Sequence, residues 1–213
     1  MKIRQSGFNV VRIPIGYWAY DTFGSPYVSG AAPYIDAAID WSRRLGLKVI
    51  IDLHGAPGSQ NGFDNSGQRL DQPTWQSGDT VQQTLEVLRT ISQKYAQPAY
   101  RNVVIGIQLL NEPALFSPQL SFDVTKQFYR DGYGQVRDVS DTTVVLHDGF
   151  RQPNEWNGFL TPSDANAQRV SVDHHEYQVF ENDLVSMTPE EHRQFVCTRA
   201  PTYSGADKWT FGT

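Results

Sequence analysis

The sequence has only one cysteine, Cys197, among its 213 residues. One thiol excludes an internal disulfide and a zinc site built on cysteines. No apolar run reaches the roughly 18 residues of a membrane-spanning helix. The net charge of −5 disfavours nucleic acid and anionic membrane surfaces as partners. We therefore expect a folded globular protein with neither a membrane span nor a nucleic-acid partner.

Two further signals are missing. No glycine-rich phosphate-binding motif follows any apolar run, so nucleotide binding has no support and we predict no cofactor. The first residues, MKIRQSGFNVVRIPIG, lack the apolar region of a signal peptide. Strand-like residues begin at Val10, and the closing WTFGT (209–213) resembles a strand that has just started. We expect the chain to be a fragment of a longer protein, truncated at both ends.

Short β-branched runs alternate with helical patterns along the chain. The runs are nearly continuous in apolar residues, as in parallel strands that are buried on both faces. We predict strands at Val10–Ile15, Lys48–His54, Val103–Leu110, Thr143–His147 and Arg169–His175. We predict helices at Pro33–Leu45, Asp79–Tyr95 and Ser121–Val139, with a capping box of Asp79 and Gln82 and a C-cap at Gly46. The pattern indicates a single α/β domain over residues 1–213.

Polar or ionisable side chains mark all five predicted strands. They are Arg12 within the first run, His54 at the end of the second, Asn111 and Glu112 at the end of the third, His147 and Asp148 at the end of the fourth, and 173–177 (DHHEY) at the end of the fifth. An open doubly wound sheet gathers its ligand groups at one switch point, whereas a barrel brings the carboxyl ends of all its strands to one face. The distribution predicts an incomplete (β/α)8 TIM barrel with its site on that face.

Glu112 and the loop after the second predicted strand suggest the chemistry. Burial at the end of an apolar strand raises the pKa of a carboxyl group, as a general acid requires. Asn111 can hydrogen-bond a hydroxyl group, and the loop at 55–67 (GAPGSQNGFDNSG) combines amide and carboxylate groups with Phe63. Phe180 adds a second flat apolar face. Flat faces bordered by hydrogen-bonding groups suit a sugar ring, although each of these residues alone also fits a structural role.

Four segments, in this order, resemble fungal exo-1,3-β-glucanases of glycoside hydrolase family 5. They are GFNVVRIPIGYWAY, IDLHGAPGSQNGFDNSG, GIQLLNEP and VDHHEYQVF. The Asn-Glu-Pro and His-x-Tyr elements are shared across that family, whereas HGAPGSQNGFDNSG points to its glucan 1,3-β-glucosidase branch. The resemblance implies a secreted, cell-wall enzyme that releases glucose from the non-reducing ends of β-1,3-glucan with retention of configuration.

The resemblance also implies a role for each matching residue. Glu112 matches the general acid/base, Arg12 the arginine that orients the nucleophile, and Asn111 the residue that holds the 2-hydroxyl. The other matches line the first sugar subsite, contact hydroxyl groups or form an aromatic clamp at the pocket mouth; they are His54, His175 and Tyr177, then Asp64 and Asn65, then Phe63 and Phe180.

A retaining enzyme also needs a nucleophilic carboxylate, and the family's glutamate matches a position just beyond Thr213. By the same resemblance the chain supplies the second to sixth barrel strands and the start of the seventh. We therefore expect the isolated 213-residue chain to be inactive, to bind β-glucan, and to be a monomer.

Two other functions remain open. Metal-capable groups gather at the strand ends (Asp52/His54, His147/Asp148 and Asp173/His174/His175), so a metal-dependent barrel hydrolase is one alternative. Against it, no strand ends in His-x-His and no helix carries His-Glu-x-x-His, and our main interpretation includes no metal. The other alternative is a glucan-binding protein without catalysis. The preference among 1,3, 1,6 and 1,4 linkages and the balance of hydrolysis and transglycosylation are not fixed by these patterns.

Overall fold

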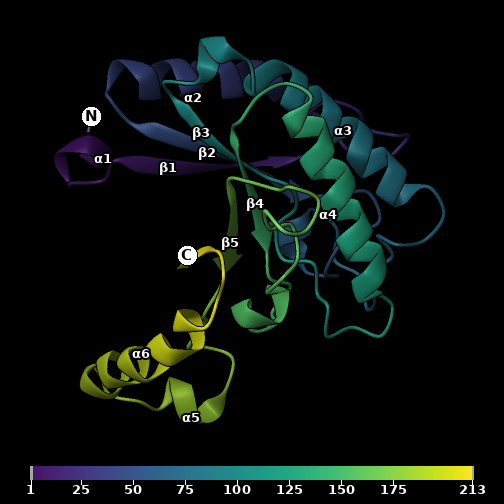
Figure 1. The fold of residues 1–213 in the computed structure, drawn as a ribbon. Coiled ribbons are helices and arrows are strands. Elements are labelled where there is room, and N and C mark those ends of the chain that lie inside the picture. Colours follow the sequence, from purple (N-terminus) through teal and green to yellow (C-terminus); the bar gives the residue numbers. More distant parts are fainter. Residues whose placement is uncertain (1, 213) are drawn as a thin grey trace.

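The computed structural model describes residues 2–212, within which six parallel strands form one sheet in chain order (Figure 1). The strands are β1 (Val10–Gly16), β2 (Lys48–Gly55), β3 (Val104–Gln108), β4 (Thr143–His147), β5 (Val170–His174) and β6 (Trp209–Gly212). Each strand pairs in parallel with the next. A sheet whose spatial order follows the chain order is that of a (β/α) barrel, because a doubly wound sheet reverses its order at a switch point. The predicted α/β class and incomplete barrel are confirmed.

Three long helices follow the first three strands and pack on the sheet (Figure 1). They are α2 (Ala32–Arg44), α3 (Thr80–Tyr95) and α4 (Phe122–Arg137), each within two residues of its predicted bounds. Gly46 has a left-handed φ of +68° just after α2, as predicted for a C-cap. The capping box predicted at the start of α3 is wrong, because the Asp79 side chain makes no capping hydrogen bond. The shorter helices are α1 (Lys2–Gln5), α5 (Asn182–Val185), and 3-10 helices at Tyr17–Ala19, Asp64–Ser66, Pro98–Tyr100 and Pro153–Trp156.

The apolar core lies between the sheet and these helices. On α3, Leu88 and Ile91 are buried on the face toward the sheet, and burial of each such side chain stabilises the fold by about 1.5–3 kcal/mol. α4 packs so closely that a Cβ atom on Gly132 would lie 3.0 Å from Leu109 Cδ1. This close approach explains a glycine in the middle of a helix, where it lowers intrinsic helix propensity.

The inner face of the sheet is polar. Arg12 of β1, Asp52 of β2, Gln108 of β3 and Asp173 of β5 meet there through side-chain contacts across the strands. Three of these four side chains are buried, so they depend on partners within the protein; Oδ2 of Asp52 and of Asp173 has such partners, whereas Oδ1 of each has none among the described residues. This polar layer lies directly below the carboxyl ends of the strands.

Between β5 and β6 the chain makes an excursion that the sequence reading missed. It contains α5 and α6 (Pro189–Ser204), which project away from the sheet (Figure 1). None of the α6 residues whose burial is described is buried, so the helix lacks the apolar stripe on which sequence recognition relies. A capping box of Thr188 and Glu191 is present at its start and was an available signal.

None of the helices described over residues 2–212 combines the length and the apolar character needed to cross a membrane.

Gly67 allows a close contact that holds the polar loop after β2. Its φ of +91° is left-handed, and a Cβ there would lie 2.4 Å from the Trp18 ring, which stacks on Tyr27. Gly78 is also left-handed, at +59°, but a Cβ there would meet no atom within 4 Å. Gly67 and Gly78 therefore share a left-handed backbone and differ in whether an added Cβ atom would clash with a neighbour.

We expect Gly78→Ala to lower the free energy of unfolding by about 1–2 kcal/mol, the cost of a left-handed alanine. Gly67→Ala should lower it by about 1–3 kcal/mol more, because the new methyl group also overpacks against Trp18. Urea unfolding of both variants measures the difference. Equal losses in the two variants would show that Trp18 does not constrain the loop.

Candidate active site

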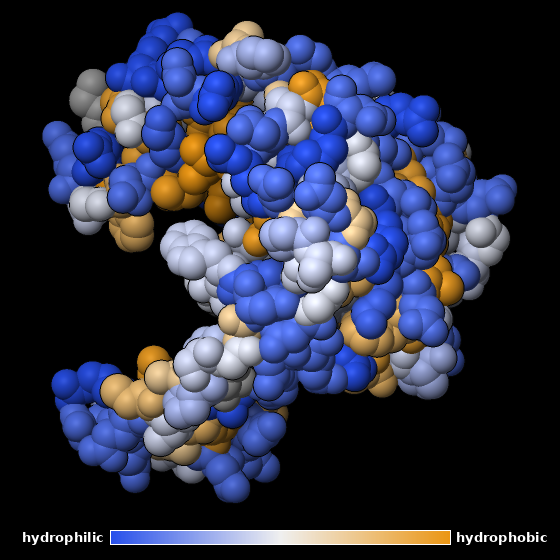
Figure 2. Space-filling model, in the orientation of Figure 1, coloured by the Kyte–Doolittle hydropathy of each residue, from blue (hydrophilic) through white to orange (hydrophobic). Residues whose placement is uncertain are grey.

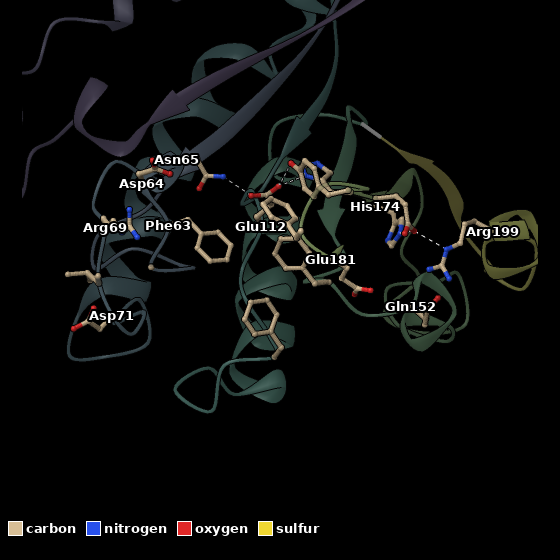
Figure 3. A pocket seen from close by; sticks show the side chains of 18 residues that line it. Phe63, Asp64, Asn65, Arg69, Asp71, Glu112, Gln152, His174, Glu181 and Arg199 are labelled. Carbon is tan, nitrogen blue, oxygen red and sulfur yellow. Dashed lines mark hydrogen bonds and ion pairs between the residues drawn. The ribbon is translucent and has the colours of Figure 1, made fainter. Parts of the chain in front are cut away.

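A cavity of about 990 Å³ opens at the carboxyl ends of the strands, and Figure 3 shows the side chains that line it. The surface is hollowed between the α5–α6 excursion and the rest of the molecule (Figure 2). Most of the site residues predicted from the sequence line this one cavity: Phe63, Asp64, Asn65, Glu112, His175, Tyr177 and Phe180. Arg12, His54 and Asn111 do not line it.

Glu112 follows β3 and is held by three side chains from two other loops. His175 Nδ1 lies 2.5 Å and the Tyr177 hydroxyl 2.7 Å from its Oε1, while Asn65 Nδ2 donates to its Oε2 at 2.8 Å. The backbone of Glu112 is left-handed, with φ of +46°, which costs about 1–3 kcal/mol for a residue with a side chain. The turn aims the carboxyl group into the cavity although the residue is only 2% exposed.

The hydrogen bonds to Glu112 overturn the expectation that its pKa is raised. Burial does raise it, but the bonds from His175, Tyr177 and Asn65 favour the carboxylate more strongly and lower the pKa of Glu112 to about 2. The predicted raised pKa is therefore wrong for this arrangement. Glu112 is ionised at neutral pH, so it needs a source of protons before it can act as an acid.

His175 lies between two carboxylates. Its Nδ1 faces Glu112 and its Nε2 lies 3.1 Å from Asp173 Oδ2. Burial lowers the pKa of a histidine, but the hydrogen bonds and charges of Asp173 and Glu112 outweigh burial and raise the pKa of His175 to about 9. His175 and Glu112 thus form an ion pair at neutral pH.

Arg12 connects the polar layer to this pair. Its Nε donates to Gln108 Oε1 at 2.7 Å, and its terminal nitrogen donates to Asn111 Oδ1 at 2.6 Å. The same nitrogen lies 3.2 Å from Asp52 Oδ2 and 3.8 Å from Asp173 Oδ2. The guanidinium group therefore pairs with the Asp52 carboxylate and shares the Asp173 carboxylate with the protonated His175.

The two remaining predicted residues lie beside Arg12. Asn111 is buried, and its Nδ2 has no hydrogen-bond partner among the described residues. His54 is partly exposed, with Nδ1 2.7 Å from Asp52 Oδ2. Their roles in holding sugar hydroxyl groups stay predictions.

Aromatic side chains form the rim of the cavity, and sequence reasoning found only some of them. Phe63 is 6.5 Å from Phe116, which is 5.7 Å from Phe150, between ring centroids. On the opposite loop, Phe180 packs 5.4 Å from Tyr177. Phe116 and Phe150 follow β3 and β4, so their position after strand ends was an available signal.

A second histidine, His174, is held beside the first but points to different partners. Its Nδ1 hydrogen-bonds Asp148 Oδ2, and its Nε2 lies 3.1 Å from Glu176 Oε2. Arg199 of α6 donates to the same Glu176 oxygen at 3.1 Å, an ion pair also drawn in Figure 3. This cluster joins the excursion to the sheet.

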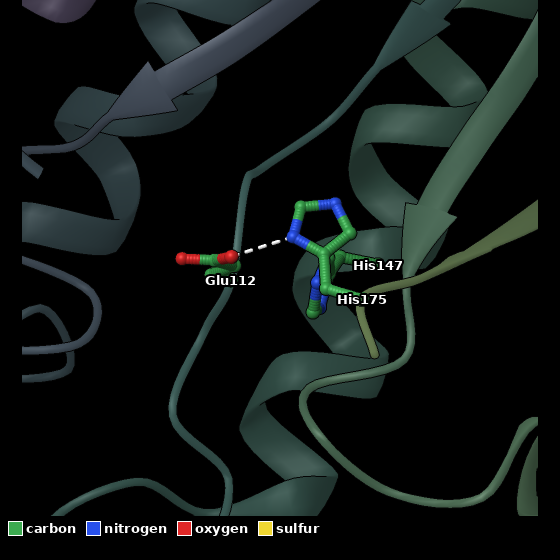
Figure 4. Close-up of side chains that lie close together, drawn as sticks. All are labelled: Glu112, His147 and His175. Carbon is green, nitrogen blue, oxygen red and sulfur yellow. Dashed lines mark hydrogen bonds and ion pairs between the residues drawn. The ribbon is translucent and has the colours of Figure 1, made fainter. Parts of the chain in front are cut away.

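Glu112, His147 and His175 come close enough to suggest a metal site (Figure 4). The Gly149 backbone N–H donates to His147 Nδ1 at 2.9 Å, so in the neutral ring Nε2 carries the proton and has no lone pair for a metal. Burial, the largest cause, and the nearby charge of His175 lower the pKa of His147, which keeps the ring neutral. Both nitrogens of His175 face carboxylates. The donor set does not fit a metal ion, which disfavours the metal-dependent alternative.

Known proteins of one family match this chain over nearly its whole length. Residues 1–208 match the family described as cellulase (glycosyl hydrolase family 5). The chain is 49% identical over 210 residues to a glucan 1,3-beta-glucosidase of Blumeria graminis and 44% identical over 214 residues to one of Candida oleophila. These matches cover 98% of this chain but 48% and 49% of those proteins, so the chain spans about half the length of the curated relatives it matches.

Solved structures share the fold at low sequence identity. A rutinosidase from Aspergillus niger aligns with a TM-score of 0.85 and 21% identity, covering 99% of this chain and 62% of that one. Endo-glycoceramidase II from Rhodococcus sp. aligns with a TM-score of 0.59 and 18% identity, covering 94% of this chain and 56% of that one.

The contacts of Arg12 with buried carboxylates lead to a prediction about the stability of the fold. We expect Arg12→Met to lower the free energy of unfolding by about 3–5 kcal/mol, because it removes the guanidinium group that pairs with the buried Asp52 and one of the two cations beside Asp173. Arg44→Met removes an exposed arginine paired with Asp40 and should cost less than about 1 kcal/mol. Urea unfolding at neutral pH measures both variants. A small loss for Arg12→Met would contradict the role of Arg12 in the polar layer.

The lowered pKa of Glu112 leads to a prediction about how the free energy of unfolding depends on pH. Because its folded-state pKa lies below the ordinary 4.5, its carboxylate stabilises the fold above that pH, and the contribution is lost as the pH falls toward 2. Glu112→Gln cannot titrate, so its free energy of unfolding should decrease less than that of the unmodified protein between about pH 5 and pH 3. Equal decreases in both proteins would mean that the carboxylate is not stabilised in the folded state.

Proposed function

The chain belongs to the cellulase family of glycosyl hydrolases, family 5, as the sequence predicted, and from that premise we propose that it carries the acid/base half of a retaining glucan 1,3-β-glucosidase. The whole protein releases glucose from the non-reducing ends of β-1,3-glucan. The observation that carries this proposal is the position of Glu112 in a cavity rimmed by phenylalanines and by amide and carboxylate groups.

Glu112 is the general acid/base. In the first step it protonates the glycosidic oxygen as the bond to the leaving sugar breaks, and in the second it takes a proton from the attacking water. Asn65 and Tyr177, which hydrogen-bond the carboxyl group, hold it in one orientation for both steps. Phe63 and Phe180 clamp the sugar at the cavity mouth, and Phe116 extends the apolar face beyond Phe63.

The nucleophile is a glutamate in the longer protein, following Thr213. β6 supports this placement, because Gly212 pairs with His174 at the edge where His175 meets Glu112. Retention requires the two carboxyl groups to be about 5–5.5 Å apart. Arg12, His54 and Asn111 are assigned by the family resemblance to orienting the nucleophile and holding the sugar.

The relatives named glucan 1,3-beta-glucosidase support the β-1,3-glucan assignment. Their fungal sources support an extracellular, cell-wall location for the whole protein. We expect the protein to act as a monomer on this neutral polysaccharide.

Glucose release from laminarin tests the proposal in the longer protein from the same source. Glu112→Gln should lower the rate on the order of 10²–10⁴-fold, because a general acid/base is lost. Glu155→Gln is the control, since Glu155 pairs with Arg151 outside the cavity. The first sugar released should be β-glucose, detected by proton NMR before it equilibrates.

The 213-residue chain alone should bind laminari-oligosaccharides without releasing glucose. Ordinary turnover by this chain, abolished by Glu112→Gln, would contradict the position of the nucleophile. Binding without turnover by the longer protein as well would favour the glucan-binding alternative.

A further inference from the structure

His175 makes two contacts that a neutral imidazole cannot satisfy together. Glu112 Oε1 lies at its Nδ1 and Asp173 Oδ2 at its Nε2, at 2.5 and 3.1 Å. An ionised carboxylate only accepts hydrogen bonds, and a neutral imidazole has one N–H. The second contact would then set a lone pair against a negative oxygen. The geometry therefore requires two protons shared among His175 and its two carboxylate partners.

Asp173 is fixed before the ligand arrives. It lies in β5 and is buried, and Gln108 Nε2 donates to its Oδ2 at 2.9 Å. The Arg12 guanidinium lies 3.8 Å from the same oxygen. Because Asp173 and His175 are two residues apart, they project to the same side of the chain. Asp173 thus holds the His175 ring with Nδ1 directed at Glu112.

We propose that Asp173 and His175 form a proton store for Glu112, with Asp173 as the positioning residue, an inference that rests on the acid/base role of Glu112 proposed above. In the first step the Nδ1 proton of His175 passes to Glu112 Oε1, and Glu112 gives it to the glycosidic oxygen. His175 is then neutral and keeps its Nε2 proton on Asp173. In the second step Glu112 takes a proton from the attacking water and returns it to His175 Nδ1, so no proton is gained or lost over the cycle.

His175 is the donor best suited to this role among the groups that contact Glu112. Tyr177 is a weaker acid, since burial and the Glu112 carboxylate raise the pKa of Tyr177 to about 12. The Asn65 amide does not give up protons in this range. A nucleophilic carboxylate about 5–5.5 Å away would make an ionised Glu112 less favourable, and so would drive the proton from His175 onto it.

The charged and titratable groups around His175 come from four strands, β1, β3, β4 and β5, or from the loops that follow them. His147 of β4 packs edge to face at 4.4 Å between ring centroids and stays neutral, as argued above. The others are Glu112 after β3, Asp173 in β5, Tyr177 after β5, Arg12 of β1 and Asp148 after β4. Glu112 and Asp173 are the two that touch the ring nitrogens with an opposite charge.

His174 provides a matched control in the same chain. It also sits between two carboxylates, Asp148 and Glu176, but neither of them contacts His175. Asp148→Asn should therefore change the titration of His174, whereas Asp173→Asn should change that of His175.

Histidine NMR on the 213-residue chain tests the store directly and needs no substrate. The ring signals of His175 should show both nitrogens protonated at pH 7, with a titration midpoint near 9. Asp173→Asn and Glu112→Gln should each lower that midpoint by about 1–3 pH units. Asp148→Asn should move it much less, because Asp148 acts on His175 through its charge and not through a hydrogen bond to the ring. A His175 that is neutral at pH 7 in the unmodified chain, or a midpoint that Asp173→Asn does not move, would overturn the proposal.

Kinetics of the longer protein separate a proton store from a purely structural role. Asp173→Asn should lower kcat/KM for laminaribiose, which reports the step that breaks the glycosidic bond, at least about 10-fold, part of the contribution of general acid catalysis. It should affect a dinitrophenyl β-glucoside much less, because that leaving group departs without a proton. Equal losses of kcat/KM on both substrates would overturn the proposal that Asp173 and His175 store a proton for Glu112. If neither substrate is hydrolysed by the unmodified protein, the glucosidase assignment fails, and the NMR result still stands on its own.

Discussion

Two buried carboxylates on the inner face of the sheet are the constraint on which the rest of the structure depends. Asp52 and Asp173 are fully buried, and a buried charge without a partner costs several kcal/mol. Arg12 reaches both of them, and Gln108 bridges Arg12 to Asp173. Because these side chains come from four different strands, the contacts that neutralise the charge also fix the strands relative to one another. An apolar inner face would pack without this requirement.

The candidate site is the upper edge of the same polar layer. Asp173 contacts Nε2 of His175 and favours the protonated ring, and Nδ1 of His175 contacts Glu112. The left-handed backbone of Glu112 turns its carboxyl group into the cavity. The three hydrogen bonds that offset this strain also keep Glu112 ionised. The arrangement that positions the carboxylate is thus the one that makes it a poor acid at rest. A proton held on the neighbouring His175 lets Glu112 be both firmly positioned and able to act as an acid.

The sequence was informative where one chemical property repeats along the chain. Apolar, β-branched runs predicted every strand within two residues, since buried parallel strands are rich in such residues even where an inner polar layer interrupts them. The grouping of Phe63, Asn65, Glu112, His175 and Tyr177 followed from the rule that parallel strand ends converge. The pKa of Glu112 could not be predicted, because it depends on partners 47 to 65 residues away in the chain. α6 was missed since it buries no described residue and so carries no apolar stripe, and Phe116 was missed although it follows a strand end.

The most direct test of the central claim is a crystal structure of the 213-residue chain with a β-1,3-linked thio-disaccharide, whose sulfur replaces the glycosidic oxygen. The account predicts that this sulfur lies within hydrogen-bond reach of Glu112, about 3–3.5 Å from a carboxyl oxygen, between Phe63 and Phe180. A disaccharide bound in the cavity with its sulfur far from Glu112, or bound elsewhere on the protein, would contradict the acid/base assignment.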